Sequence, residues 1–347
     1  MIADFEVAIS KLVKTAIIEQ VFPGVAWAVG DTNGTVLRGA AGVLDPDQPA
    51  SLTLPTTIFD VASLTKVMAV WASVGALWEG GVLDLAEPLG SVMPEVAGYP
   101  LAPVTVHHLL THTAGVPLRA NLRAPYGTEH EAIRRGVLQE GLHRDPGTAV
   151  EYTDRAALIT GLVIEHVAGV RLDEYVLEHV WRPLGMLETQ FGPLPAALVD
   201  RAAPTEIDEA TGLRLRGVAH DFSARLLGGV CGIAGVFSPL SDIELFLRYL
   251  SDGRVVGPAG FGQKWVAESL QIHTGNLQPA RGFFWHPAPG TAAEEGIYVH
   301  YGFTGTAMWV DRAQGLWATL LTNKLYFSRD REPIAMIRDA FRALVFN

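Results

Sequence analysis

The composition of the chain is that of a compact globular protein. It has 347 residues, of which 49% are hydrophobic and 18% charged, so a disordered chain is excluded. A formal net charge of −11 argues against nucleic acid or an anionic membrane as a main partner. The single cysteine, Cys231, allows neither an internal disulfide nor a thiolate metal cluster, and its apolar, glycine-rich surroundings predict a buried structural thiol.

The N-terminus predicts an amphipathic helix. Apolar residues recur at helical spacing from Phe5 to Val13, while Asp4 and Glu6 stand where a signal peptide would carry positive charge. No uncharged run of about 18 residues occurs elsewhere, so we expect no membrane span. A cytoplasmic protein is therefore the expectation.

Strands are expected near both ends of the chain. A hairpin is predicted from residues 24–30 and 35–42, joined by the turn Asp31-Thr32-Asn33-Gly34. Two further strands are expected at 307–310 and 316–322, followed by a closing helix over 333–345.

The middle of the chain is mostly helical in pattern. Helices are predicted over 63–79, 106–112, 154–170 and 172–181. Strands from both termini then form one antiparallel sheet, which makes the chain an α+β protein. We expect a sheet domain from residues 1–62 and 220–347, flanked by the N- and C-terminal helices, and a mostly helical domain over 63–219.

The segment Ser63-Leu64-Thr65-Lys66 is the first candidate for chemistry. A serine three residues before a lysine on a helix places both side chains on one face, so the amine can reach the hydroxyl proton. A serine is a weak nucleophile until a base removes that proton, and lysine is such a base only when neutral. Burial and the positive end of the helix dipole both favour the neutral amine. The backbone N–H of Ser63 can also face a developing oxyanion.

Two further segments carry polar groups that suit the same chemistry. Tyr152-Thr153-Asp154 precedes a helix, so Tyr152 is either a proton shuttle or a half-buried aromatic, with Asp154 capping the helix in the second case. His300-Tyr301-Gly302-Phe303 leads into a predicted strand, where an edge can pair with a substrate backbone. The alternative is a plain glycine-rich turn.

Other readings of the chain are weaker. His107, His108 and His112 lack the carboxylate and spacing of a zinc site, so we expect no metal and no cofactor. The chain contains no Gly-x-Ser-x-Gly nucleophile elbow and no phosphate-binding loop.

Taken together, these segments resemble the serine β-lactamase and penicillin-binding protein superfamily, in its class C β-lactamase, D,D-carboxypeptidase and family VIII esterase branch. That superfamily carries Ser-x-x-Lys, Tyr-x-Asn and Lys-Thr-Gly or His-x-Gly in this order. Here the corresponding segments run from Ser63 to Lys66, Tyr152 to Asp154, and His300 to Gly302. The similarity covers nearly the whole chain from about residue 20 and implies a β-lactamase/transpeptidase-like fold.

The resemblance implies two-step acyl transfer. Ser63 would attack a carbonyl, Lys66 with Tyr152 would move the proton, and water would hydrolyse the acyl-enzyme. Asp154, His300, Gly302 and Phe303 would contact the substrate, with the Phe303 N–H as the second oxyanion donor.

Two positions depart from the superfamily pattern. Asp154 replaces the usual asparagine, and a carboxylate beside Lys66 would raise the lysine pKa. His300 replaces the lysine of class C β-lactamases, and a neutral imidazole holds a substrate carboxylate less well. Asp154, together with Gly217-Val218-Ala219-His220-Asp221 and Gly228-Gly229-Val230, resembles a sub-branch of the superfamily. That sub-branch includes cytoplasmic-type esterases and amidases that remove stem peptides from muramic acid.

The sequence therefore predicts a serine hydrolase that acts on a small ester, amide or β-lactam. The alternatives are a class C-type β-lactamase or D,D-carboxypeptidase, and a catalytically silent binding protein on the same scaffold. The oligomeric state is left open.

Overall fold

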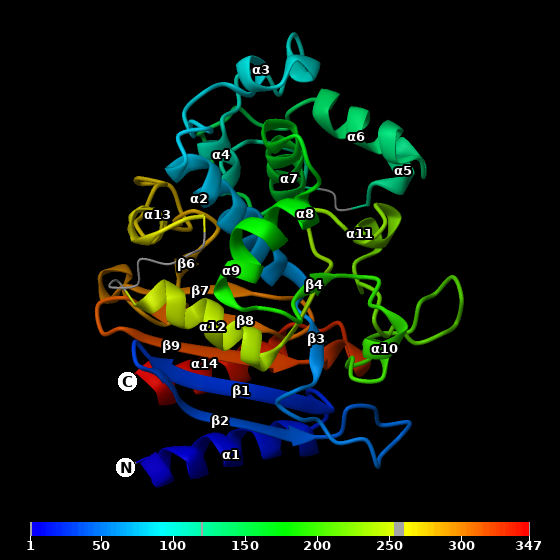
Figure 1. The fold of residues 1–347 in the computed structure, drawn as a ribbon, viewed down its shortest axis with the longest axis vertical. Helices are drawn as coiled ribbons and strands as arrows, with labels where there is room; N and C mark the ends of the chain where they lie inside the picture. The colour runs from blue at the N-terminus through cyan, green and yellow to red at the C-terminus, as the bar shows by residue number, and fades with distance from the viewer. Residues whose placement is uncertain (1, 119–120, 253–259, 347) are drawn as a thin grey trace.

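A six-stranded antiparallel sheet forms the base of the molecule. The computed structural model describes residues 2–118, 121–252 and 260–346. The strand order is β2-β1-β9-β8-β7-β6, which joins the two ends of the chain in one sheet, as predicted (Figure 1). Its strands are β1 (Gly24–Asp31), β2 (Gly34–Gly42), β6 (His286–Pro287), β7 (Ile297–Tyr301), β8 (Ala307–Asp311) and β9 (Leu316–Thr322).

The two terminal helices cover one face of this sheet. They are α1 (Ile2–Ile18) and α14 (Glu332–Phe346), and they contact each other. Their apolar faces form one buried cluster with the strands, in which Phe341 of α14 lies 5.6 Å from Trp309 of β8 between ring centroids. Helix α12 (Leu240–Ser251) packs on β1, β8 and β9 and joins the larger core cluster (Figure 1).

A mostly helical region occupies the other end of the molecule (Figure 1). Its helices are α2 (Ala72–Glu79), α3 (Leu89–Val92), α4 (Val106–Leu110), α5 (Arg123–Tyr126), α6 (His130–Gln139), α7 (Asp154–Ala168), α8 (Leu172–Val176), α9 (Arg182–Leu184), α11 (Phe222–Leu226) and α13 (Gln263–Ser269). The short helix α10 (Ala196–Val199) lies beside the sheet instead (Figure 1). Among the described residues, no helix is long and apolar enough to cross a membrane. The α+β class is confirmed, and the proposed domain boundaries stay a prediction.

A small second sheet links the two regions, and the sequence patterns did not predict it. Its order is β3-β5-β4, built from β3 (Ile58–Asp60), β5 (Val236–Pro239) and β4 (Gln190–Phe191). These strands are two to four residues long, too short for an alternating pattern to identify. Strand β3 leads directly into the segment that carries Ser63.

The helix predicted over 63–79 is not one regular helix. It starts as a 3₁₀ turn (Ala62–Leu64), continues as a π-helical turn (Lys66–Trp71) and becomes α-helical only at α2. The hydroxyl of Thr65 accepts a hydrogen bond from the Val236 amide at 3.1 Å, which ties this junction to β5. Apolar periodicity alone does not distinguish such turns from an α-helix, and π-helical turns occur often at functional sites.

Two other predicted helices also differ in detail. The helix over 106–112 ends at Leu110, because His112 adopts a left-handed backbone conformation with φ 57°. The pattern over 172–181 is α-helical to Val176 and π-helical over Leu177–Trp181.

We predict that Phe341→Ala destabilises the fold by about 3–5 kcal/mol, because it leaves a cavity between α14 and the sheet. Phe341 is fully buried, whereas Met336 on the same helix is 64% exposed. Met336→Ala should change the free energy of unfolding by no more than about 0.5 kcal/mol. Urea unfolding followed by circular dichroism measures both. Equal effects of the two changes would contradict this account of the packing.

Candidate active site

Lys66 lies directly against Ser63. Its Nζ is 3.0 Å from Ser63 Oγ, and the lysine side chain is fully buried. The ammonium also donates to Asp154 Oδ1 and to the Ile233 carbonyl, each at 2.8 Å. The structure therefore joins the nucleophile turn, the start of α7 and the loop before β5 at one nitrogen atom.

Asp154 decides the charge of this lysine. Burial by itself lowers the pKa of Lys66, but the negative charge of Asp154, followed by the nearby Tyr152, raises that pKa above its usual value. Lys66 is thus an ammonium at neutral pH. This differs from the neutral amine that the Ser-x-x-Lys spacing suggests for a base, and the physical reason is the carboxylate of Asp154.

A buried pair behind Ser63 shapes the backbone that presents it. Asp60 Oδ2 accepts from both the amide and Nδ1 of His220, at 2.8 and 2.9 Å, and Asp60 Oδ1 accepts from the Ala62 amide at 2.9 Å. Ala62 has a φ of 52°, a conformation that costs a residue with a Cβ about 1–3 kcal/mol. The Asp60 hydrogen bond holds this strained residue immediately before Ser63. Burial lowers the pKa of His220, but the negative charge of Asp60 outweighs burial and raises that pKa overall.

Tyr152 lies above the lysine and between two other side chains. Its ring centroid is 5.4 Å from Lys66 Nζ, 4.6 Å from the His112 ring and 5.6 Å from the Arg281 guanidinium carbon. Tyr152 is 42% exposed, so substrate can approach it. Burial, then the charge of Arg281, lowers the pKa of His112 well below its ordinary value, so His112 is a neutral support for this ring.

His300 is a neutral hydrogen-bond acceptor on the wall of the site. Its Nδ1 lies 2.7 Å from the Phe284 carbonyl oxygen and therefore donates to it, which leaves Nε2 with its lone pair. That Nε2 is buried and has no partner among the described residues. Burial, then the Lys66 charge, lowers the pKa of His300 well below its usual value.

The end of β7 remains an open edge beside Ser63. Strand β6 pairs only with Tyr298 and Val299, so it stops short of His300. Gly302 packs so closely that a Cβ would collide with the hydroxyl of Thr306 and the backbone oxygen of Val61. Among the described residues, the next amide, that of Phe303, forms no backbone hydrogen bond. It is thus available as an oxyanion donor.

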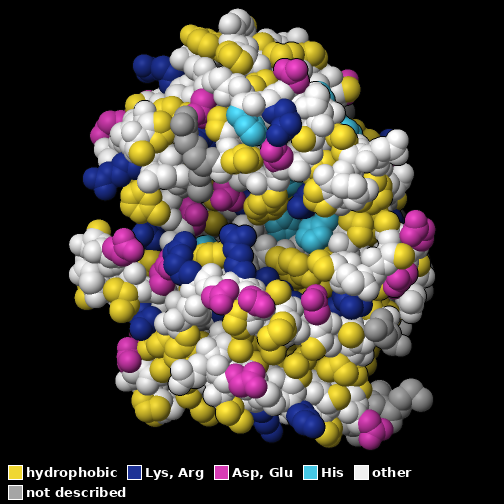
Figure 2. Space-filling view, turned by 180° about the vertical axis from the view of Figure 1, so that it is seen from behind, with side chains coloured by type: hydrophobic (Ala, Val, Ile, Leu, Met, Phe, Trp, Pro, Cys, Tyr) yellow, Lys and Arg dark blue, Asp and Glu magenta, His cyan; other side chains and the backbone are white. Residues whose placement is uncertain are grey.

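Two cavities meet at the nucleophile. Both are lined by Ser63, Tyr152 and Phe303, and their volumes are about 440 and 790 Å³. The smaller one includes His300 and Gly302, while the larger one includes Asp154 and His220. Figure 2 shows a hollow in this face of the molecule, with histidine side chains inside it and Lys and Arg side chains beside it. Six of the seven residues singled out in the sequence therefore line these cavities, and the seventh, Lys66, lies buried against Ser63.

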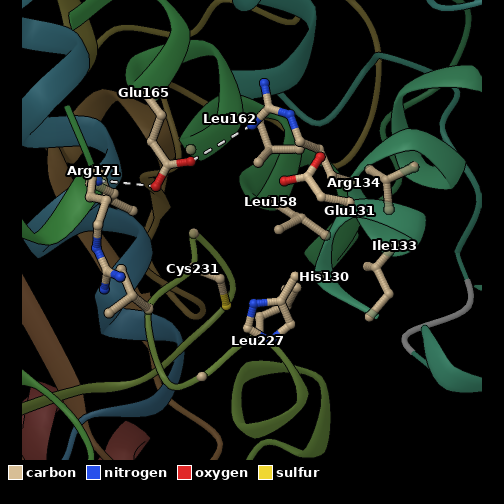
Figure 3. Close-up of a pocket in the computed structure, with 16 residues that line it drawn as sticks. His130, Glu131, Ile133, Arg134, Leu158, Leu162, Glu165, Arg171, Leu227 and Cys231 are labelled. Carbon is tan, nitrogen blue, oxygen red and sulfur yellow. Dashed lines mark hydrogen bonds and ion pairs between the residues drawn. The ribbon is translucent and has the colours of Figure 1, made fainter. Parts of the chain in front are cut away.

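A separate cavity of about 330 Å³ lies between α6, α7 and the loop 227–232 (Figure 3). Both of its arginines have carboxylate partners, since Arg134 donates to Glu95 and Arg171 donates to Asp173. Glu165 accepts from the Leu172 amide at 3.1 Å and lies 3.9 Å from Arg134. Cys231 lines this cavity, and burial raises the pKa of its thiol to about 12, as suits a structural cysteine.

Several site residues were not identified from the sequence. Asp60 and His220 support the backbone, Ile233 contributes a carbonyl acceptor and Arg281 a cation. His220 lies in a segment that carries the sub-branch resemblance, but its role at the site was not predicted. These four residues come from four distant segments, so only the folded chain brings them together. No group of three or more His, Cys, Asp or Glu side chains suitable for a metal occurs in the part of the chain that the structure describes.

Comparison with known proteins agrees with this geometry. The family model described as Beta-lactamase matches residues 9–341. A putative D-alanyl-D-alanine carboxypeptidase of Escherichia coli K12 is 28% identical over 345 residues, which cover 87% of this chain and 79% of the relative. An N-acetylmuramyl-L-alanine amidase of Bacillus subtilis 168 is 28% identical over 302 residues, which cover 77% of this chain and 68% of the relative.

Solved structures show the same fold. A class C β-lactamase from Rhodobacter sphaeroides superposes with a TM-score of 0.77 at 18% identity, over 97% of this chain and 98% of that one. The resemblance inferred from the three segments is confirmed, because the family match spans nearly the whole chain. The chain belongs to the beta-lactamase family and is a serine hydrolase.

Proposed function

We propose that the protein hydrolyses small esters or amides through an acyl-enzyme formed on Ser63. The observation that carries this proposal is the contact of 3.0 Å between Ser63 Oγ and the buried Lys66 ammonium. A binding protein without catalysis would have no use for a lysine held at the nucleophile by Asp154 and a backbone carbonyl. The cytoplasmic location expected from the sequence stays a prediction.

In the proposed reaction, the phenolate form of Tyr152 takes the proton of the Ser63 hydroxyl and becomes the phenol. Lys66 is an ammonium and cannot accept a proton itself, but its charge stabilises a negative oxygen on the neighbouring phenol. Ser63 Oγ then attacks the carbonyl carbon, and the Ser63 and Phe303 amides hold the oxyanion. Tyr152 returns the proton to the leaving group, and water completes hydrolysis by the same route.

Amides as well as esters are included because of two relatives. The Escherichia coli and Bacillus subtilis proteins are named as a putative carboxypeptidase and an amidase, and both names imply cleavage of an amide bond. A class C-type β-lactamase or D,D-carboxypeptidase remains the second candidate, supported by the family match.

We predict that Ser63→Ala lowers the rate of p-nitrophenyl butyrate hydrolysis by at least about 10³-fold, because no other hydroxyl replaces the nucleophile. Ser91→Ala, at an exposed serine, serves as the control and should retain wild-type rates. A phosphonate probe followed by intact-mass measurement should label the wild type at Ser63 once. Folded wild-type protein that neither turns over the ester nor reacts with the probe would instead indicate a silent binding protein.

We predict that Asp154→Asn lowers the pKa of Lys66. Burial, which lowers this pKa, remains in the variant, whereas the carboxylate charge that raises it is gone. The Lys66 ammonium should therefore lose its proton at lower pH than in the wild type, and the alkaline limb of kcat/KM should move the same way. Lysine Nζ NMR titration measures the shift, with the exposed Asp200→Asn, outside both cavities, as the control. An unchanged Lys66 titration would refute the assigned role of Asp154.

We predict that nitrocefin is turned over more slowly than the butyrate ester, because His300 is neutral at the position where class C β-lactamases carry a lysine. The cations Lys324 and Arg331 of the same cavity surround Phe303 instead. Initial rates with both substrates test this, and intact mass after penicillin shows whether an adduct accumulates. Faster hydrolysis of nitrocefin than of the ester would favour the second candidate.

A further inference from the structure

The smaller cavity beside Ser63 collects positive charge. Its lining includes four cationic side chains and the single carboxylate of Asp339; the cations are Arg281, Lys324, Arg331 and Arg338. This excess is unexpected in a chain whose net charge is −11. Figure 2 shows Lys and Arg side chains gathered beside the hollow on this face. We call this space the cationic cavity.

Within the described residues, none of these four cations forms an ion pair with a carboxylate. Lys324 Nζ donates to the backbone oxygens of Ser328 and Asp330, at 3.1 and 2.6 Å. Arg338 Nη2 donates to the carbonyls of Gly302 and Thr306, at 2.6 and 2.7 Å. These acceptors are uncharged carbonyl oxygens, so neither cation is in direct contact with a carboxylate.

Unused donors point to a missing partner. The Nε and Nη1 atoms of Arg281 and the Nε of Arg338 are buried, and none of them has a hydrogen-bond acceptor in the described part of the chain. In the larger cavity, by contrast, Arg225 pairs with Asp208 and Arg329 pairs with Glu206. The excess of positive charge is therefore a property of the cationic cavity and not of the whole cleft.

Burial and the clustering of positive charge also lower the pKa of two of these groups. Burial, followed by the charge of Arg338, lowers the pKa of Lys324 to about 8. Burial lowers the pKa of Arg338 to about 10. A bound anion would relieve both the desolvation and the mutual repulsion.

Phe303 brings this charge next to the reacting atoms. Lys324, Arg329 and Arg331 surround its ring at 5.1, 5.0 and 4.9 Å from the centroid. The amide of the same residue is the proposed oxyanion donor, so an anion held here would belong to a substrate already positioned at Ser63. His300 does not compete for that anion, because its free Nε2 presents a lone pair.

We propose that the cationic cavity binds a multiply charged anionic group of the substrate, of the phosphate or diphosphate class, beside the ester or amide bond that Ser63 attacks. With four cations and only the carboxylate of Asp339, the cavity has more positive charge than one carboxylate group of a substrate could balance. Phosphate oxygens also accept several charge-assisted hydrogen bonds at once from arginine and lysine. This inference rests on the proposed hydrolase function, whose substrate class it narrows.

Inorganic phosphate, pyrophosphate and acetate are the probes, compared at constant ionic strength. We expect phosphate or pyrophosphate to inhibit p-nitrophenyl butyrate hydrolysis competitively, with an inhibition constant at least about tenfold lower than that of acetate. Tighter inhibition by pyrophosphate would identify a diphosphate as the preferred group, and tighter inhibition by phosphate a monoester. Acetate binding as tightly as both would overturn the proposal.

Arg331→Gln is the decisive variant, because Arg331 is exposed and its loss leaves the core intact. It should weaken phosphate inhibition by about tenfold, and Lys324→Gln should do the same if the protein folds. Arg135→Gln, an exposed arginine on α6, is the matched control and should leave inhibition unchanged. Undiminished inhibition in Arg331→Gln would overturn the proposal.

A second readout separates this inference from the proposed function. The anions should raise the thermal midpoint of the wild type in the order found for inhibition, and Arg331→Gln should lose the rise. This measurement needs no turnover, so phosphate binding without ester hydrolysis would count against the hydrolase function alone. Ester hydrolysis without any phosphate effect would count against the cationic cavity alone.

Discussion

The site depends on one buried positive charge, the ammonium of Lys66. A buried ammonium without acceptors would cost several kcal/mol, so its three partners are as much a condition of folding as of chemistry. Ser63, Asp154 and the Ile233 carbonyl come from three separate segments, and each accepts a hydrogen bond from this nitrogen. The charge therefore sets the distance between the nucleophile turn, α7 and the loop before β5.

Neutralisation of Lys66 by Asp154 shapes the rest of the cleft. The pair carries no net charge, and His300 and His112 are neutral as well, since burial lowers the pKa of both. Ser63 also lines the cationic cavity, whose cations form no ion pair within the described residues. The reacting groups and the proposed substrate-binding cations thus lie in different parts of the site. Phe303 lines both cavities and lies between these parts.

Local patterns were sufficient where a segment carries its own signal. The hairpin of β1 and β2, the strands β8 and β9 and the closing helix α14 follow from alternation, turn residues and helical periodicity. The same holds for Ser63 and Lys66, because a spacing of three residues brings two side chains to one face of any helical turn. Local patterns did not predict the 3₁₀ and π turns around these two residues. The hydrogen bond from the Val236 amide to Thr65 comes from a remote strand, which no local pattern reveals.

The sequence by itself determined the fold class, the family resemblance, six of the residues that line the cleft and the buried Lys66 beside them, because short motifs and periodicity are local properties. Only the tertiary structure decided the charge of Lys66, since that depends on how closely Asp154 approaches across 88 positions of the chain. It likewise decided which nitrogen of His300 is free, how Asp60 and His220 support Ala62, and where unpaired cations gather. Such properties follow from distances and burial, and neither can be known before distant segments pack against each other.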